Sequence, residues 1–535
     1  MKTPALIGVT GVAAALCFAA IAQDTTTKED PPTVTGQEFV PIFDGETLDG
    51  WDGEAEFWSV EDGAITGTTT DDDPIPYNKF IIWENGEVDD FELKLKYRII
   101  GGNSGIQYRS FVIDKDPKKG TPLEYVLGGY QADIDSSPKF SGIVYGEKFR
   151  GIHAKRGEKT VMNEDGKPEL VEQFADAEEL QSHINEEDWN EYHIIAKGNH
   201  VIHKINGVVM SESTDNDTDE RRDSGLLGFQ IHRGPPMKVQ FKDIELKRLP
   251  LEDKKKVVFV AGAPSHAPRA HEHNAGSDLL AALINEHYGD EVLATVYHSG
   301  WPADRSAFQN ADAVVIFSDG GQRHPGFFHR RQLDYLADQG IGIGCIHYAV
   351  EMLPDESNQD LISWIGGAFE TFYSVNPHWT AQFTDIPDHP VANGVAPFDI
   401  LDEWYFNMRF ADNMDGVTPI LSAIPPDETM SRPDGHHSGN PEVRKMVADK
   451  LPQHVVWVYD RDNGGRGFGF TGGHFHDNWA DDNFRKTALN AIAWIAKADV
   501  PESGINTPTP SADQMNANLD PKPAKKPKKP KKKAA

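Results

Sequence analysis

The segment GIGIGCIHYAVE, residues 340–351, places Cys345, His347 and Glu351 directly after an apolar run. A thiol beside an imidazole and a carboxylate is the residue set of a nucleophilic centre. A nucleophile on a sharp strand-to-helix turn needs small residues two positions before and after it, but Ile343 and His347 occupy those positions. We therefore predict that Cys345 is a buried strand residue rather than a nucleophile.

His347 and Glu351 remain as candidates for catalysis. If a helix follows the strand, these residues lie four positions apart on one helix face. They would then act as an acid–base pair in which Glu351 orients the imidazole, or as metal ligands together with His266 or His474. The alternative is a histidine at the start of a helix with a solvated glutamate.

Imidazoles and carboxylates follow other apolar runs of the same region. Several runs are typical of buried parallel strands, with amphipathic helical stretches between them, and they cover residues 256–262, 291–299, 312–320, 340–347, 454–460 and 466–473. His266 and His474 follow two of these runs, and Asp319 and His347 lie at the carboxyl ends of two others. Ligands of an open α/β sheet bind at the carboxyl ends of its strands. The sequence thus predicts a doubly wound, flavodoxin-like parallel α/β domain over residues 254–499 with a site at that edge.

Residues 38–250 have the pattern of an all-β domain. The stretch FELKLKYRII alternates apolar and charged residues, which predicts a strand with one face in the core. Asp-Gly and Gly-Asn pairs between such stretches predict hairpins. Many short strands with little helix favour a jelly-roll β-sandwich.

Three of these predicted strands alternate core residues with polar ones that share a sheet face. The polar residues are Gln107, Arg109, Gln131, Asp133, Asp135, Gln230 and His232. Amides, carboxylates, Arg and His both donate and accept hydrogen bonds, as recognition of a polyhydroxylated ligand requires. The alternative is the solvated second face of an antiparallel sheet.

The stretches FDGETLDGW, NSGIQYR, GYQADID and WNEYHIIAKGNHVIHKING resemble the 3-keto-disaccharide hydrolase domain family. The resemblance implies a concanavalin-like sandwich that acts on 3-keto-glycosides. A ketone at C3 of a sugar acidifies the proton on C2, so a base can remove it and the group on C1 can be eliminated, after which water can add. Such a site needs a base and a group that stabilises the enolate.

The polar residues are assigned to these roles as follows. The base is Asp133 or His232. The enolate partner is Arg109, or a divalent metal near Asp133 and Asp135. Substrate contacts are expected from Gln107, Gln131, Asp135, Glu147 and Gln230, and Glu147 and His153 are reserve candidates for catalysis.

The second domain resembles the ThuA-like (trehalose-utilisation) family, which has a class I glutamine amidotransferase-like fold. The matching stretches are GAPSHAPRAHEHNAG, DHPVANGV, FDILDEWYF and GRGFGFTGGHFHDNW. The resemblance implies action on a related keto-sugar, and the positions to examine are His266, His347 and His474 as metal ligands and Asp402 and Glu403 as substrate contacts. The absent nucleophile turn at Cys345 argues against amidotransferase activity. We expect a divalent metal ion and no nucleotide cofactor.

The two ends of the chain differ from its body. Residues 1–22 have the pattern of a signal peptide cut near Ala22, which predicts a periplasmic or secreted protein, and residues 23–37 form a linker. Residues 500–535 are predicted to be a disordered tail, and eight lysines in its last fifteen residues predict contact with an anionic polymer or surface, or a solvated tether.

Composition narrows the partners of the protein. The formal net charge of −32 disfavours nucleic acid, and no later segment is apolar enough for a membrane span. We therefore expect a small-molecule or oligosaccharide substrate for an exported two-domain hydrolase or lyase. The alternatives are a non-catalytic carbohydrate-binding surface protein, or a protein in which only the α/β domain is catalytic.

Overall fold

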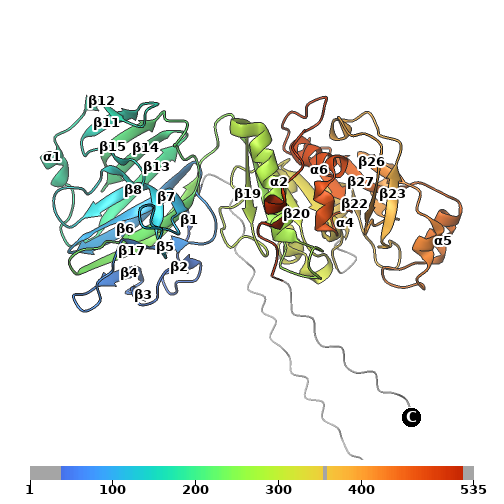
Figure 1. Ribbon diagram of the computed structural model, residues 1–535, viewed down its shortest axis with the longest axis horizontal. Coiled ribbons are helices and arrows are strands. Elements are labelled where there is room, and N and C mark those ends of the chain that lie inside the picture. Colours follow the sequence, from blue (N-terminus) through green and yellow to red (C-terminus); the bar gives the residue numbers. More distant parts are fainter. Residues whose placement is uncertain (1–37, 354–357, 522–535) are drawn as a thin grey trace, which may run out of the picture. The chain divides into compact units, whose positions relative to one another are not determined.

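The computed structural model describes residues 38–353 and 358–521. The predicted signal peptide, the linker and the lysine-rich end lie outside these residues and remain predictions. The described chain contains an N-terminal β part followed by an α/β part, and each is described by itself (Figure 1).

Alternation of apolar and polar residues builds the N-terminal part from two packed, largely antiparallel sheets. One sheet contains, in spatial order, β10 (Gly151–Ala154), β9 (Val144–Glu147), β8 (Leu127–Asp135), β7 (Asn103–Val112), β16 (Leu226–Ile231), β5 (Lys79–Trp83) and β2 (Trp51–Asp52). The other contains β12 (Pro168–Gln173), β11 (Glu158–Met162), β15 (Val208–Asp215), β14 (His200–Ile205), β13 (Asn190–Lys197), β6 (Phe91–Ile100), β17 (Met237–Arg248), β4 (Ala64–Thr69) and β3 (Trp58–Glu61), with β1 (Val40–Pro41) beside β17. A short helix, α1 (Ala177–Gln181), lies between β12 and β13 in the chain.

The two sheets enclose a single apolar core. Alternate residues of β6 are buried, and on β8 Tyr130, Ala132 and Ile134 enter the core while Gln131 and Asp133 point to the opposite face. Asp62 and Gly63 form the predicted tight turn between β3 and β4, both with positive φ. This part is a jelly-roll β-sandwich, as the alternation predicted.

The α/β part is built on a seven-stranded mixed sheet. Its order is β19 (Val292–Tyr297), β18 (Lys255–Ala261), β20 (Ala313–Phe317), β21 (Gly342–Ile346), β28 (Arg466–Phe470), β27 (Gln453–Asp460) and β26 (Val417–Ala423). The first five strands are parallel, whereas β27 runs antiparallel to both of its neighbours, β28 and β26. The prediction of a parallel strand at 454–460 is therefore wrong, because the five residues that join β27 to β28 make a hairpin and are too few for a crossover.

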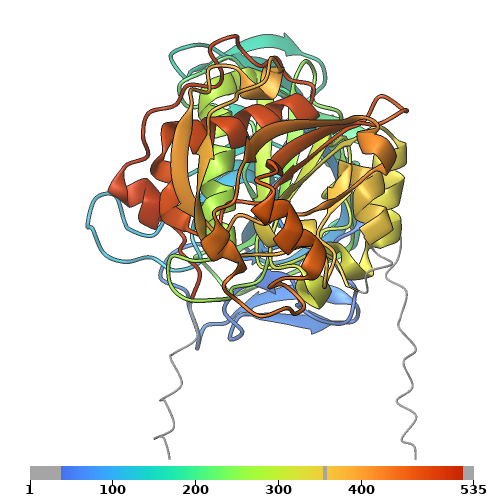
Figure 2. The ribbon, with the colours of Figure 1, turned by 90° about the vertical axis from the view of Figure 1, so that its right-hand side faces the viewer.

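Helices cover both faces of this sheet. Alternate residues of β18 enter two different cores, since Val257 and Phe259 pack with α2 (His273–Tyr288) and α6 (Asp482–Ile495), while Val258 and Val260 pack with the side of α3 (Arg330–Asp338) and α4 (Asn358–Ile365). Figure 2 shows the red and green helices on one side of the sheet and the yellow helices on the other. The part is therefore doubly wound, as predicted.

Shorter elements complete this part. They are α5 (Pro441–Ala448), α7 (Ala512–Asn516) and two small antiparallel sheets, β22 (Gly367–Ala368) with β25 (Arg409–Phe410), and β23 (Trp379–Phe383) with β24 (Phe398–Asp402). Among the described residues, no helix is both long and apolar enough to cross a membrane.

The prediction that the tail is disordered from residue 500 is wrong for residues 500–521. Ile505 and Met515 are buried in the core beside α2 and α6. Asp520 accepts hydrogen bonds from the backbone N–H of His273 (3.1 Å) and from Asn274 Nδ2 (2.7 Å), at the start of α2. The Pro and Lys residues of 500–535 favoured a prediction of disorder, but they give no information on these few anchoring apolar side chains.

Candidate functional sites

In the β-sandwich, polar side chains of the adjacent strands β8, β7 and β16 form a network. It lies on the face of their sheet that points away from the apolar core. We call Gln107, Gln131, Asp133 and Gln230 the amide ladder. Gln230 Nε2 donates to Gln131 Oε1 (3.0 Å), and Gln131 Nε2 donates to Asp133 Oδ1 (3.1 Å). On β7, Gly105 pairs with Asp133, and a Cβ added there would lie 2.4 Å from Gln131 Cδ. The glycine therefore makes the space that the Gln131 side chain fills.

Asp133 is the acid of the ladder, and its carboxyl group is only 5% exposed. It accepts hydrogen bonds from Asn103 Nδ2 (3.1 Å) and Gln131 Nε2. Burial outweighs these hydrogen bonds and raises the pKa of Asp133 to about 8. A carboxylate with this pKa is a much stronger base than an exposed aspartate and titrates near neutral pH.

Three further predicted residues lie on the same strands or at their ends. Glu147, at the end of β9, is buried and accepts from Asn78 Nδ2 (3.1 Å), and burial raises its pKa. His232 directly follows β16 and is half-buried, and burial lowers its pKa. Asp135 accepts from Ser137 N (2.8 Å) and Ser137 Oγ (2.9 Å), so its carboxylate fixes the turn after β8.

Gln107 faces Gln131 across the β7–β8 pair. Its Oε1 accepts from Ser110 Oγ (3.1 Å), while its Nε2 has no acceptor among the described residues. An unsatisfied buried donor is costly, so this amide is available to an oxygen of a ligand that reaches the ladder.

Arg109 does not belong to the ladder, and its predicted role as enolate partner is wrong. The register of β7 against β8 shifts between Tyr108 and Phe111, and Arg109 has φ of +46°. This bulge breaks the alternation on which the prediction rested. The guanidinium instead pairs with Asp90 (2.7 Å) and donates to the carbonyl oxygen of Gly198 (2.6 Å), where it is buried.

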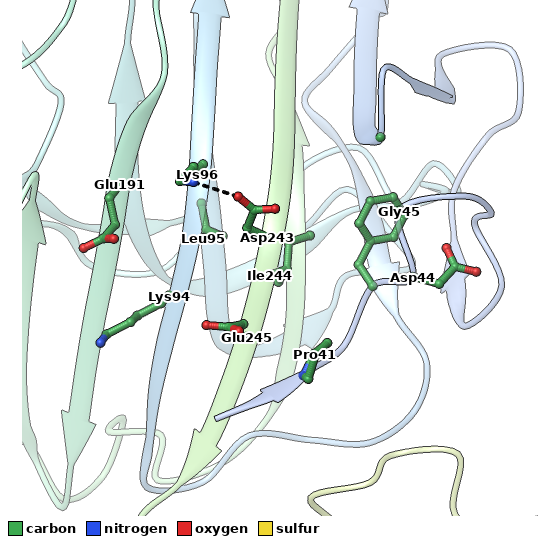
Figure 3. Close-up of a pocket in the computed structure, with 12 residues that line it drawn as sticks. Pro41, Asp44, Gly45, Lys94, Leu95, Lys96, Glu191, Asp243, Ile244 and Glu245 are labelled. Atoms are coloured by element: carbon green, nitrogen blue, oxygen red, sulfur yellow. Dashed lines mark ion pairs between the residues drawn. The ribbon is translucent and has the colours of Figure 1, made fainter. Parts of the chain in front are cut away.

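A hollow of about 470 Å³ lies on the other sheet of the sandwich and contains none of the predicted site residues (Figure 3). Lysines and acids from β6, β13 and β17 line it, and Lys96 pairs with Asp243 (2.9 Å). Charged side chains that line one face of a sheet in this way are typical of an outer, solvated sheet face.

Four side chains of the α/β part converge beside the carboxyl ends of β21 and β28. We call His271, His347, His474 and Glu403 the histidine cluster. His271 Nε2 lies 3.1 Å from His347 Nε2 and 3.0 Å from His474 Nδ1, and Glu403 Oε2 lies 3.1 Å from His474 Nδ1 and 3.6 Å from His347 Nε2. The structure thus brings together His347, His474 and Glu403 of the predicted residues.

His271 occupies the place that the sequence analysis gave to His266. His266 stacks on His271 at 3.6 Å between ring centroids, and its Nδ1 lies 2.9 Å from Ser265 Oγ. His266 is not one of the four residues of the histidine cluster, but with His271 and Asp319 it forms a second group of possible metal ligands, so its role as a ligand stays a prediction. The stretch HAPRAHEH contains three histidines within eight residues, and their spacing does not indicate which of them joins the cluster.

Two buried acceptors orient the cluster. His271 Nδ1 donates to Asp319 Oδ1 (2.7 Å), and His347 Nδ1 donates to the carbonyl oxygen of Thr471 (2.9 Å). Burial lowers the pKa of His271 to about 4 and lowers that of His347 as well, which favours the neutral form of both rings. Asp319 follows β20, one of the predicted strand ends.

Glu351 does not form a helical pair with His347, and that prediction is wrong. The turn after β21 is one turn of 3₁₀ helix (His347–Val350), and Glu351 is already extended. The carboxylate of Glu351 lies 3.1 Å from His437 Nε2. Cys345 is fully buried on β21, as predicted, and burial raises the pKa of its thiol.

Asp402 positions the cluster and is not exposed to a substrate. It is fully buried and accepts from the backbone N–H groups of Gly473 (2.9 Å) and His474 (3.1 Å) and from Asn478 Nδ2 (2.9 Å). Its predicted substrate contact is therefore wrong, because the carboxylate is used by the turn that carries His474.

Glu403 and its neighbours form the accessible side of the cluster. Burial opposes ionisation of Glu403, but its interactions with His378 and His474 hold its pKa below the usual range. The side chains of His378 and His266 are 51% and 44% exposed, whereas His271 and His347 are buried. Solvent therefore reaches the cluster past His378 and His266.

Two family models match the chain in succession. Residues 38–247 match the 3-keto-alpha-glucoside-1,2-lyase-like domain, and residues 256–495 match the trehalose utilisation (ThuA) family. A search of curated proteins finds no match.

Solved structures resemble each part separately. A candidate glycosyl hydrolase from Parabacteroides distasonis ATCC 8503 is 20% identical, with 41% of this chain and all of that chain covered and a TM-score of 0.26. The carbohydrate binding module CBM66 from Bacillus subtilis is 13% identical (37% and 95% covered, TM-score 0.23). A candidate ThuA-like protein from Bacteroides uniformis ATCC 8492 is 16% identical (46% and 93% covered, TM-score 0.33).

Proposed function

Because the chain joins a 3-keto-alpha-glucoside-1,2-lyase-like domain to a ThuA domain, we propose that its sandwich cleaves 3-keto-glycosides by elimination or hydrolysis. The α/β part then acts on a related keto-sugar. The pattern of the first 22 residues supports export to the periplasm or the medium.

The raised pKa of Asp133 is the observation that carries this proposal. A general base works best when its pKa lies near the working pH, and Asp133 meets this condition with a value of about 8. His232 is the alternative base, but burial lowers its pKa and makes it a weaker one. We assign the base to Asp133.

The reaction follows from the position of the ketone. The Asp133 carboxylate removes the C2 proton, the C–H electron pair forms the C2–C3 double bond of an enolate, and the electron pair of the C3 carbonyl double bond moves to the C3 oxygen. Collapse of the enolate forms the C1–C2 double bond and breaks the bond from C1 to the glycosidic oxygen, which takes up the proton now held by Asp133 and leaves as an alcohol. Addition of water to the double bond gives the hydrolysis product. Amide donors such as Gln107 Nε2 replace Arg109 as the candidates for holding the enolate oxygen.

The test is release of a chromogenic leaving group by the full chain from a 3-keto-glucoside and from the unoxidised parent glucoside. We expect release from the keto form alone, and loss of turnover with retained binding in Asp133→Asn. Asp49→Asn, an exposed aspartate of the same domain, is the matched control. A parallel His232→Gln variant tests the second base.

Each outcome has a clear meaning. Turnover of the keto form that persists in Asp133→Asn would overturn the assignment of the base. If neither compound is cleaved but both bind, the non-catalytic carbohydrate-binding alternative is correct. If release is lost in variants of the histidine cluster and not in Asp133→Asn, only the α/β part is catalytic.

A further inference from the structure

We propose that His271, His347, His474 and Glu403 together bind one divalent transition-metal ion of the zinc type. This inference goes beyond the proposed function, because metal binding by the α/β part can be measured without any sugar. It rests on the hydrogen-bond partners that orient the ring nitrogens, on the distances between the ligand atoms and on the elements that position them.

The partners of the two buried histidines fix their protons. Thr471 O and the Asp319 carboxylate can only accept hydrogen bonds, so the Nδ1 atoms of His347 and His271 carry the protons. Both rings then present an Nε2 lone pair, and these two nitrogens face each other at 3.1 Å. No neutral tautomer that keeps both outer hydrogen bonds places a proton between them.

A proton on His474 cannot satisfy all of the lone pairs that face one another in the cluster. Its Nδ1 lies 3.0 Å from His271 Nε2 and 3.1 Å from Glu403 Oε2, and a single N–H can donate to only one of them. The Tyr405 hydroxyl lies 3.4 Å from both His347 Nε2 and Glu403 Oε2, and its one proton can serve only one of them. More electron-pair donors than protons therefore converge, and one of the donors is an anionic carboxylate. A bound cation would convert this repulsion into coordination.

The distances match a compact coordination shell. Four ligands around zinc, with bonds of about 2.0 to 2.1 Å, lie about 3.3 Å from one another in a tetrahedron. Four of the six distances between these atoms run from 3.0 to 3.6 Å, and the ligand atoms of all four residues lie within 4.8 Å of one another. Three imidazole nitrogens favour zinc and its transition-metal neighbours over magnesium or calcium, which prefer oxygen ligands.

The surroundings supply the outer hydrogen bonds that such ligands use in metalloproteins. Asp319 orients His271, Thr471 O orients His347, and Asp402 fixes the backbone of His474. The side chains of His474 and Glu403 keep 12% and 14% exposure. The ion is therefore accessible from the side of His378, where an oxygen of a ligand can join it.

The test measures binding of Zn²⁺ and Co²⁺ to the full chain, without an oligohistidine tag, after removal of metal with a chelator. Calorimetry should give one high-affinity site per chain, zinc should raise Tm, and the visible bands of Co²⁺ should report nitrogen and oxygen ligands. His347→Gln and Glu403→Gln should each weaken binding at least tenfold. Asp319→Asn should weaken it by about 10- to 100-fold, as removal of such an outer partner typically does.

The controls separate the cluster from the rest of the chain. His436→Gln, an exposed histidine of the same part, should bind zinc like the unchanged protein. If His347→Gln fails to fold, Glu403→Gln still tests whether the cluster binds the metal, because it replaces only one carboxylate oxygen of a partly exposed side chain. The absence of a zinc-dependent rise in Tm, or equal affinity in Glu403→Gln and His436→Gln, would overturn the proposal. Neither result depends on whether Asp133 cleaves a keto-glycoside.

Discussion

The raised pKa of Asp133 leads to a prediction about how the reaction rate depends on pH. Only its ionised form can remove a proton, and its pKa is raised to about 8. We expect kcat/KM for a 3-keto-glucoside to rise with pH through about 8 and then to level off, because kcat/KM reports groups of the free enzyme. A pH profile of initial rates measures this, and a rate that does not change across this range would exclude Asp133 as the base.

The raised pKa of Asp133 also leads to a prediction about how the free energy of unfolding depends on pH. The folded state raises the pKa of Asp133 from 3.8 to about 8, so between these values the folded chain keeps a proton that the unfolded chain loses. The contribution of Asp133 to the free energy of unfolding is thus full below about pH 4 and falls as pH rises towards 8, by at most about 1.4 kcal/mol per pH unit.

Urea denaturation of the unchanged protein and of Asp133→Asn at several pH values measures this contribution. The difference in free energy of unfolding between the two proteins should move in favour of the Asn variant as pH rises, and should become constant above pH 8. A constant difference from pH 5 to 8 would contradict the raised pKa.

For Arg109 we predict an effect on stability and not on catalysis, because this residue stabilises the fold. Its guanidinium pairs with Asp90 and is buried. Arg109→Leu leaves that carboxylate unpaired in the interior and should cost about 3 to 5 kcal/mol of unfolding free energy. Denaturation measures the loss, and the fraction that remains folded should keep its KM. A stable variant with lost turnover would restore Arg109 to the active site.

At the scale of elements, the regular strands and helices followed from local patterns. The strand β6 and the turn between β3 and β4 were predictable because one face is buried and because the turn contains Asp-Gly. The gathering of His347 and His474 was predictable because both follow parallel strands.

The missed features depend on tertiary contacts. The bulge at Arg109 is stabilised by Asp90 and Gly198, which lie far away in the sequence. The 3₁₀ turn after β21 replaces a helix because His347 must reach Thr471 and His271. No local pattern contains these partners, so sequence spacing alone placed Arg109 and Glu351 wrongly.

The β7–β8 pair yields a prediction about the ladder. Gly105→Ala places a methyl group against the Gln131 side chain, which must move away from Asp133. We expect reduced cleavage of the 3-keto-glucoside with little change in far-UV circular dichroism. Gly234→Ala is the control, because its methyl group would meet only His232 Nδ1, at 3.8 Å. Equal activity in the two variants would remove the ladder from the site.

At the scale of the whole molecule, residues 500–521 are part of the α/β fold. A chain that ends at residue 499 loses Ile505 and Met515 from the core, each worth about 1.5 to 3 kcal/mol when fully buried. We expect a lower Tm than for the full chain, measured by calorimetry, while a chain that ends at residue 521 should unfold like the full chain. Equal Tm values for both truncations would show that this segment does not stabilise the fold.

The anchor at Asp520 also determines where the basic end of the chain begins. Asp520 is held by the first residues of α2, which begins two residues after His271. The fourteen residues from 522 to 535 contain eight lysines and can extend at most about 50 Å. If an anionic surface binds these lysines, the distance between that surface and Asp520 is therefore limited to this length. The α/β part would then stay close to the surface and to any molecule that the surface releases.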